Sequence, residues 1–202
     1  MMRLGLYGGS FDPIHLGHLR PVMQAVEQLQ LDRVTYLPTG NPPHKPDVDF
    51  APASRRFAMT EIALLGYERL QVSDLELSDE PSYTIDSVEH FRRLAPGADL
   101  HLLLGSDSLA RIDTWRRWRD LFDQASLVVL ARPGWSREAV LGHVPDEVRE
   151  AIHDGSVSWV DNRPLDISAT EIRRRLRAGW QLPRDWVPEP VLDYVRKYSL
   201  YS

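Results

Sequence analysis

Short apolar runs alternate with segments of helical spacing along almost the whole chain. The runs end at glycine, proline or polar residues, which predicts strands over residues 3–7, 33–37, 100–104, 125–130 and 157–160. Apolar positions three or four apart predict helices over residues 19–29, 54–65, 82–94 and 188–198, with shorter helical patterns after 113–118, over 137–141 and from 167 onward. We expect residues 70–77 to be extended.

Strands that alternate with helices are typical of an α/β fold. We predict a Rossmann-like, doubly wound, mostly parallel sheet with helices on both faces, followed by a small helical part over about residues 168–202. No repeat, low-complexity tract or linker divides the sequence, so we expect a single domain over residues 1–202. The turns that follow the strands should share one edge, where ligands of such folds bind.

Local signals refine the helix starts and the longest loop. Ser54 is predicted to cap the helix over 54–65, and either Ser168 or Thr170 to cap the helix that follows 167. Prolines crowd residues 38–46, which excludes a helix or a central strand and predicts a stiff loop there.

Composition narrows the class of protein. The chain has 202 residues, of which 43% are hydrophobic and 26% charged, as in an ordinary soluble protein. A net charge of −5 gives no reason to expect a nucleic-acid partner. The absence of cysteine excludes disulfides, thiolate metal sites and cysteine nucleophiles. No run is long enough to cross a bilayer and no targeting pattern opens the sequence, so we expect a cytoplasmic protein without a membrane partner.

The turn over residues 8–18, with the sequence GGSFDPIHLGH, carries the first candidate chemistry. A glycine-bearing turn between a strand and a helix offers free N–H groups and a helix dipole to an anion. His15 and His18 are three residues apart, so they project from the same side of the helix start, and Gly17 removes a side chain between them. Two imidazoles suit several phosphate oxygens, and a polyphosphate would favour their charged form.

Two other interpretations of the histidine pair stay open at this point. One histidine could cap the helix while the other is incidental. A zinc site is the second alternative, but the sequence offers no obvious third ligand at a metal-binding spacing.

Two motifs together indicate a family. Residues 8–18 resemble the H-x-G-H signature of the nucleotidyltransferase superfamily, and residues 167–173, with the sequence ISATEIR, resemble its second motif, I-S-(S/T)-T-x-I-R. Ala169 replaces the commoner serine. Four intervening segments, 43–45, 82–86, 105–107 and 113–115, are similar to those of the bacterial nicotinate-nucleotide adenylyltransferases. The resemblance covers essentially the whole chain and implies a single nucleotidyltransferase domain over residues 1–202.

The resemblance implies a reaction and its substrates. The family joins the adenylyl group of ATP to the 5′-phosphate of nicotinate mononucleotide and releases pyrophosphate, which yields deamido-NAD in NAD biosynthesis. Mg²⁺ would be carried by the ATP phosphates, because this ion prefers oxygen ligands and keeps water, so no protein metal site is expected. The partners implied are these two small molecules, and a homo-oligomer is left open.

The resemblance also assigns residues. The catalytic groups are His15, His18 and Arg173. Contacts to ATP are assigned to Gly8, Gly9, Ser10, Phe11, His15, His18, Gly105, Asp107, Ile167, Ser168, Thr170 and Arg173. Contacts to nicotinate mononucleotide are assigned to Asn41, His44, Lys45, Thr84, Trp115 and Arg116.

Chemistry supports the two substrate sites. A guanidinium such as that of Arg173 binds phosphate oxygens through paired donors. A pyridinium ring stacked on the Trp115 indole would gain cation–π attraction, and Thr84 at a helix start offers a hydroxyl and an N–H to a carboxylate. The remaining tryptophans are expected to serve packing; they are Trp118, Trp135, Trp159, Trp180 and Trp186.

Rival functions remain. The acceptor could instead be nicotinamide mononucleotide or phosphopantetheine, although Thr84 and Trp115 suit a flat ring with an acid. A non-catalytic nucleotide-binding module would not need His15, His18 and Arg173 together. A dinucleotide oxidoreductase is disfavoured, because the glycines at 8 and 9 do not form G-x-G-x-x-G.

Overall fold

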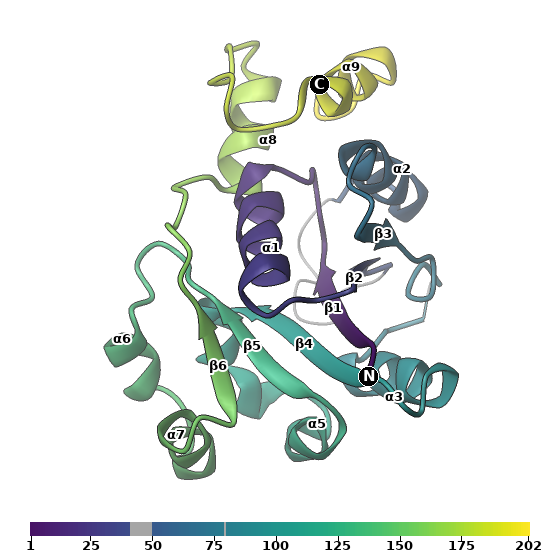
Figure 1. Cartoon of the computed structure of the whole chain (residues 1–202). Coiled ribbons are helices and arrows are strands. Elements are labelled where there is room, and N and C mark those ends of the chain that lie inside the picture. Colours follow the sequence, from purple (N-terminus) through teal and green to yellow (C-terminus); the bar gives the residue numbers. More distant parts are fainter. Residues whose placement is uncertain (41–49, 79) are drawn as a thin grey trace.

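A computed structural model describes residues 1–40, 50–78 and 80–202. These residues form a six-stranded sheet with the strand order β3-β2-β1-β4-β5-β6 (Figure 1). All strand pairs are parallel. The strands are β1 Arg3–Gly9, β2 Arg33–Pro38, β3 Leu70–Val72, β4 Asp99–Gly105, β5 Ser126–Leu130 and β6 Val157–Val160. The strand order reverses between β1 and β4, which is the point where doubly wound folds bind ligands.

Helices connect the strands and confirm the predicted doubly wound α/β fold. The described helices are α1 Leu16–Gln28, α2 Ala53–Leu64, α3 Thr84–Leu94, α4 Ser106–Leu109, η1 Ile112–Thr114, α5 Trp118–Gln124, α6 Arg137–Leu141, α7 Asp146–His153, α8 Ala169–Arg177 and α9 Glu189–Lys197. Within the described ranges, none of them is long and apolar enough to span a membrane.

Two apolar layers hold the helices against the sheet. Successive strand residues alternate between these layers, so Leu103 packs on one face of β4 while Leu102 packs on the other. The first layer joins the sheet to α1, α2, α8 and α9, and the second joins it to α3, α4, α5, α6 and α7. Helices therefore cover both faces, as predicted.

Strand register brings the functional turns to one edge. Gly9 pairs with Pro38 across β1 and β2, and Gly105 pairs with Leu130 across β4 and β5. The turns that follow these four strands therefore start side by side. Figure 1 shows α8 close to the start of α1 at this edge. The predicted common edge is confirmed.

Helix α1 begins three residues earlier than the apolar spacing predicts, at Leu16 rather than Leu19. The first N–H group of the helix, from Leu16, donates to the carbonyl of Trp186 over 2.8 Å. The carbonyl of His15 accepts from the N–H groups of His18 and Leu19. A distant segment thus satisfies a helix end, which local periodicity does not reveal.

Three further expectations need correction. The prediction that Ser54 caps α2 is wrong, because Pro52 is the N-cap and its carbonyl accepts from the N–H groups of Arg55 and Arg56. The extended segment predicted over 70–77 ends as a strand at Val72, since the chain then turns. Helix α7 was not expected, and it buries only Val148 and Ile152.

The prediction that Trp180 serves packing is also wrong. This residue is 53% exposed, and its ring lies beneath the Arg174 guanidinium at 4.9 Å. Trp118, in contrast, is 8% exposed and belongs to the second apolar layer.

Candidate active site

Two stacked imidazoles stand at the start of α1. His15 is the N-cap and is 2% exposed, whereas His18 lies in the first turn and is half-buried. Their ring centroids are 3.7 Å apart, with 29° between the ring planes. The backbone N–H of His15 donates to Nδ1 of His18 over 3.3 Å, which leaves the ring proton of a neutral His18 on Nε2. Nε2 is therefore the ring nitrogen through which a neutral His18 donates.

Gly17 makes room for the buried histidine. A Cβ atom at this position would lie 3.0 Å from two atoms of the His15 ring and 3.6 Å from Cβ of Ile167. Such contacts are tighter than normal for the ring, so a side chain here would displace it. The glycine that the sequence suggests for close ligand approach therefore also positions His15.

The electrostatic state of His15 follows from its surroundings. Burial and the nearby Arg132 guanidinium lower the pKa of His15 to about 3. The imidazole is therefore neutral at pH 7 in the ligand-free protein. From the sequence we expect a polyphosphate to favour the charged form of the imidazoles. A bound anion would raise the pKa of His15, which burial and Arg132 lower.

Arg132 is a site residue that sequence reasoning missed. Its Nη1 donates to the carbonyl of Gly17 and its Nη2 to the hydroxyl of Tyr7, each over 2.9 Å. Its backbone N–H donates to Oγ of Ser106 over 3.0 Å. Arg132, which follows β5, therefore forms hydrogen bonds to residues of β1, of α1 and of the segment directly after β4. The available signal was an arginine directly after an apolar strand, at the ligand-binding edge.

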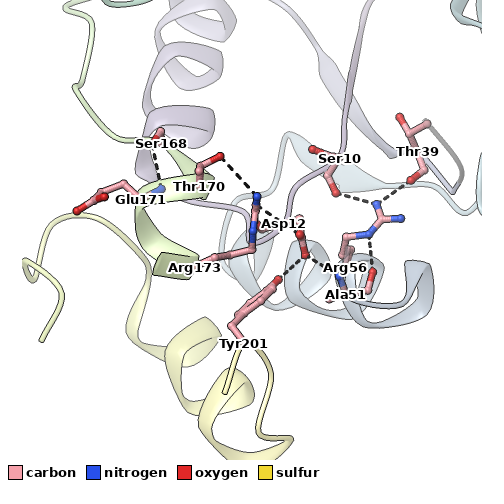
Figure 2. Close-up of polar contacts among 10 residues, drawn as sticks. All are labelled: Ser10, Asp12, Thr39, Ala51, Arg56, Ser168, Thr170, Glu171, Arg173 and Tyr201. Atoms are coloured by element: carbon pink, nitrogen blue, oxygen red, sulfur yellow. Dashed lines mark hydrogen bonds and ion pairs between the residues drawn. The ribbon is translucent and has the colours of Figure 1, made fainter. Parts of the chain in front are cut away.

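The second motif packs against the first. Nη1 of Arg173 donates to the carbonyl of Asp12 over 2.7 Å and lies 3.4 Å from its Oδ2, as Figure 2 shows. Ser168 accepts from the N–H of Glu171 over 3.2 Å and is the cap of α8. Thr170 lies within α8, where its hydroxyl accepts from Nη2 of Arg173 at 3.5 Å. Two segments that are 161 residues apart in sequence meet here.

The four residues that open the turn differ in what they can present. Gly8 is exposed, and a Cβ there would meet no atom within 4 Å. A Cβ on Gly9 would lie 2.8 Å from the Phe11 ring. Phe11 is 1% exposed, and its ring contacts the His18 ring edge-on with the centroids 5.2 Å apart, so the whole residue is buried. Ser10 uses its carbonyl to accept from Arg56.

Gly105 and Asp107 lie at the end of β4, next to the first motif. A Cβ on Gly105 would lie 2.4 Å from Oδ1 of Asp107 and 3.2 Å from Nε of Arg132. Asp107 is half-buried in the first turn of α4. Burial raises the pKa of the Tyr7 hydroxyl. The Arg132 guanidinium lowers this pKa, and the Asp107 carboxylate raises it. The carboxylate of Asp107 therefore lies among the groups of the site.

The residues predicted for the second substrate come together in part. Thr84 is the first residue of α3, and Trp115 follows η1. The Arg116 guanidinium lies 4.6 Å from the Tyr83 ring centroid and 4.0 Å from Asp86, which joins the two segments. Asn41, His44 and Lys45 lie outside the described residues.

Two buried charged groups connect the turns, and sequence reasoning missed both. Arg56 is 1% exposed, and its donors satisfy backbone carbonyls of Ala51, Ser10, Thr39 and Gly40. Glu76 is 7% exposed, and burial raises the pKa of its carboxyl while the hydroxyls of Ser82 and Ser87 donate to it. Neither residue stands in a pattern that local spacing detects.

A cavity opens beside Arg132, beyond the ends of β5 and β6. Its volume is about 450 Å³, within the range of small-molecule sites. Its lining is mostly apolar and includes Pro133, Trp135, Trp159 and Pro164. In the part of the chain that the structure describes, no three histidine, aspartate or glutamate side chains gather as a metal site.

Known proteins resemble this chain in sequence and in fold. The family described as cytidylyltransferase-like matches residues 6–175. A Thermus thermophilus protein named "Probable nicotinate-nucleotide adenylyltransferase" is 45% identical, with 99% of this chain and 100% of its own length covered. A Solibacter usitatus protein of the same name is 41% identical, with both chains covered completely.

A solved structure matches the fold. The Plasmodium falciparum nicotinic acid mononucleotide adenylyltransferase complexed with NaAD superimposes with a TM-score of 0.80. It is 21% identical, and the match covers 100% of this chain and 98% of that chain.

Proposed function

The chain belongs to the cytidylyltransferase-like family and, within it, to the nicotinate-nucleotide adenylyltransferases, and we propose that it transfers the adenylyl group of ATP to the 5′-phosphate of nicotinate mononucleotide. The products are nicotinate adenine dinucleotide, or deamido-NAD, and pyrophosphate, in NAD biosynthesis. The observation that carries the proposal is the meeting of both motifs, since Arg173 binds the turn that ends in the stacked His15 and His18.

The site suits the triphosphate of ATP. The open position at Gly8 and the positive end of the α1 dipole suit phosphate oxygens. His18 offers its Nε2 proton to the α-phosphate, and Arg173 offers its remaining donors to the β- and γ-phosphates. We assign the ribose hydroxyls to Asp107, whose carboxylate can accept hydrogen bonds from them. Ile167, Ser168 and Thr170 line the opposite side through the start of α8.

The reaction needs placement and charge stabilisation more than proton transfer. An oxygen of the acceptor phosphate attacks the α-phosphorus, a new P–O bond forms, and the bond to the β-phosphate bridging oxygen breaks. The acceptor phosphate is already an anion, so no general base is required. His18 and Arg173 stabilise the charge that develops on the α-phosphate and on the departing pyrophosphate. This arrangement makes no covalent enzyme intermediate.

Nucleotidyltransferases of this kind generally use a divalent metal ion with ATP. We propose Mg²⁺ bound to the phosphate oxygens and water as part of the substrate, because this ion prefers oxygen ligands and keeps its waters. The guanidiniums of Arg132 and Arg173 beside the turn suit the anionic substrate.

We assign the acceptor site to α3 and the segment after η1. Thr84 offers a hydroxyl and a helix N-terminus to the nicotinate carboxylate, and Trp115 offers its ring to the pyridinium. Arg116 links both segments through Tyr83 and Asp86. The assignment of Asn41, His44 and Lys45 to the same substrate stays a prediction.

We further propose that residues 1–202 act as one nucleotidyltransferase domain, with the helical portion from about 168 forming part of the ATP site. Both substrates are small molecules. The homo-oligomer, the absence of a nucleic-acid partner and the cytoplasmic location stay predictions.

The proposal is tested by product analysis. Purified protein with ATP, Mg²⁺ and nicotinate mononucleotide should release pyrophosphate and form one equivalent of deamido-NAD, detected by chromatography. Omitting the acceptor serves as the control and should yield neither product. Absence of the dinucleotide under conditions where the protein binds ATP would contradict the proposed function.

A further inference from the structure

A buried carboxylate lies behind the ATP site. Asp12, in the turn between β1 and α1, is 0% exposed. Three elements from distant parts of the sequence face it with charged or titratable groups: α2 with Arg56, α8 with Arg173 and the segment after α9 with Tyr201 (Figure 2). A buried carboxylate needs such partners, because burial without them is costly.

The two oxygens of Asp12 have different environments. Oδ1 accepts from the Tyr201 hydroxyl over 2.5 Å and from the N–H of Ala51 over 3.2 Å. Oδ2 accepts no hydrogen bond from the described residues and faces Nη1 of Arg173 at 3.4 Å. Fixing one oxygen therefore fixes the direction in which the other meets the guanidinium.

We propose that Tyr201 is a positioning residue for the reaction: its hydroxyl holds the Asp12 carboxylate in the orientation that keeps the Arg173 guanidinium in the ATP site. The role of Arg173 rests on the proposed function. Tyr201 itself acts through Asp12. Nothing in the sequence around Tyr201 indicates this role, because the two residues are 189 positions apart.

Charge balance explains why a hydroxyl is needed at this position. Burial raises the pKa of Asp12, while the hydrogen bond from Tyr201 and the charge of Arg173 oppose that rise. Burial and the neighbouring carboxylate also raise the pKa of Tyr201, so its hydroxyl stays protonated and donates. Loss of this donor would raise the pKa of Asp12 further. Arg173 would then lose its counter-charge at a higher pH than in the unmodified protein.

Packing alone would predict a different outcome. The ring of Tyr201 belongs to the first apolar layer, so Tyr201→Phe keeps the packing and removes only the hydroxyl. Tyr198→Phe is the matched control, because it makes the same chemical change in the same segment. The Tyr198 ring lies 3.9 Å from Cζ of Arg55, on the side of α2 rather than at Asp12.

The test measures binding of a Mg²⁺-loaded α,β-methylene ATP analogue by titration calorimetry, without acceptor, at pH 8, 7 and 6. Tyr201→Phe should weaken binding about tenfold at pH 7, the effect of losing one hydrogen bond to a charged group, and more at pH 6. Tyr198→Phe should bind within about twofold of the unmodified chain, as expected for a surface change. Thermal unfolding checks that both variants are folded.

Two results would overturn the proposal. One is unchanged affinity of folded Tyr201→Phe at all three pH values. The other is an equal loss when Tyr201→Phe is added to Arg173→Ala, because a residue that acts through Arg173 has no further effect once that side chain is gone. The analogue needs no acceptor, so a chain that binds it but makes no deamido-NAD would contradict the proposed function while leaving this test valid.

Discussion

His15 and His18 are the same residue type in two different environments. His15 is buried as the N-cap of α1, and its ring packs closely against Gly17. His18 is half-buried and is oriented by the backbone N–H of His15. We infer that His15 acts as a neutral, rigid support and that His18 presents the proton to the substrate. The close stacking of the two rings joins these roles.

The low pKa of His15 predicts a pH dependence of stability. The folded group takes up a proton only near pH 3, whereas the unfolded group does so near its ordinary pKa of about 6.5. The unfolded state therefore binds more protons between these values, and stability falls as pH decreases through this window. From pH 7 to pH 5 the unmodified chain should lose about 2 kcal/mol of unfolding free energy more than His15→Asn.

Urea unfolding at the two pH values checks this expectation. The raised pKa values of Asp12 and Glu76 act in both proteins and largely cancel in the comparison. Identical pH dependence of the two proteins would show that His15 already binds a proton in the folded state near neutrality.

His18 predicts a kinetic effect. Removing a donor aimed at the developing charge costs about 10²- to 10³-fold in turnover in related situations, and His18→Ala should fall in this range with its fold retained. Steady-state pyrophosphate release measures the effect. His153→Ala, at the end of α7, is the matched control and should turn over normally. Near-normal turnover of His18→Ala would refute its assigned role.

At the scale of elements, Arg56 connects three segments that form the site. Its guanidinium satisfies carbonyls after β1, after β2 and before α2. Arg56→Met would leave these buried carbonyls without their donor and should lower the unfolding free energy by about 3–5 kcal/mol. The neighbouring Arg55→Met, whose side chain lies against Tyr198, should cost less than about 1 kcal/mol.

Denaturant unfolding of both variants at pH 7 measures the difference. Equal losses for the two arginines would mean that the hydrogen bonds of Arg56 contribute little to joining the turns.

Sequence patterns predict a strand or a helix correctly where neighbouring residues alone determine it. Continuous apolar runs predict the strands, and spacings of three and four predict α1, α2, α3 and α9, because burial of one face sets both periods. Helix starts are less predictable. The first turn of α1 depends on the Trp186 carbonyl, and the first turn of α2 on Pro52 rather than Ser54.

Some residues of the candidate site could likewise be predicted from local sequence, and others could not. His15, His18 and Arg173 stand in recognisable motifs, so their meeting could be predicted. The role of Tyr201 could not be predicted, and that of Arg132 only through its place directly after an apolar strand, because tertiary packing alone brings their partners together. The sequence separation of such contacts leaves no periodic or spacing signal.

For the whole molecule, the strand order explains why these residues meet. The order reverses between β1 and β4, which opens the edge at the first motif and at Gly105. Helix α8 then returns from the end of β6 to place Arg173 over the same turn. The proposed triphosphate site therefore draws on both ends of the sequence, whereas the proposed acceptor site draws on its middle, at Thr84 and Trp115.

If the middle of the chain forms the acceptor site, the choice of acceptor depends on Thr84 and Trp115. The measurement is kcat/KM for nicotinate mononucleotide and for nicotinamide mononucleotide, side by side, with the same ATP and Mg²⁺ concentrations. Hydrogen bonds from Thr84 to a charged carboxylate should favour the acid by about tenfold to a hundredfold. Equal values, or a faster reaction with the amide, would contradict the assignment of the nicotinate carboxylate to Thr84.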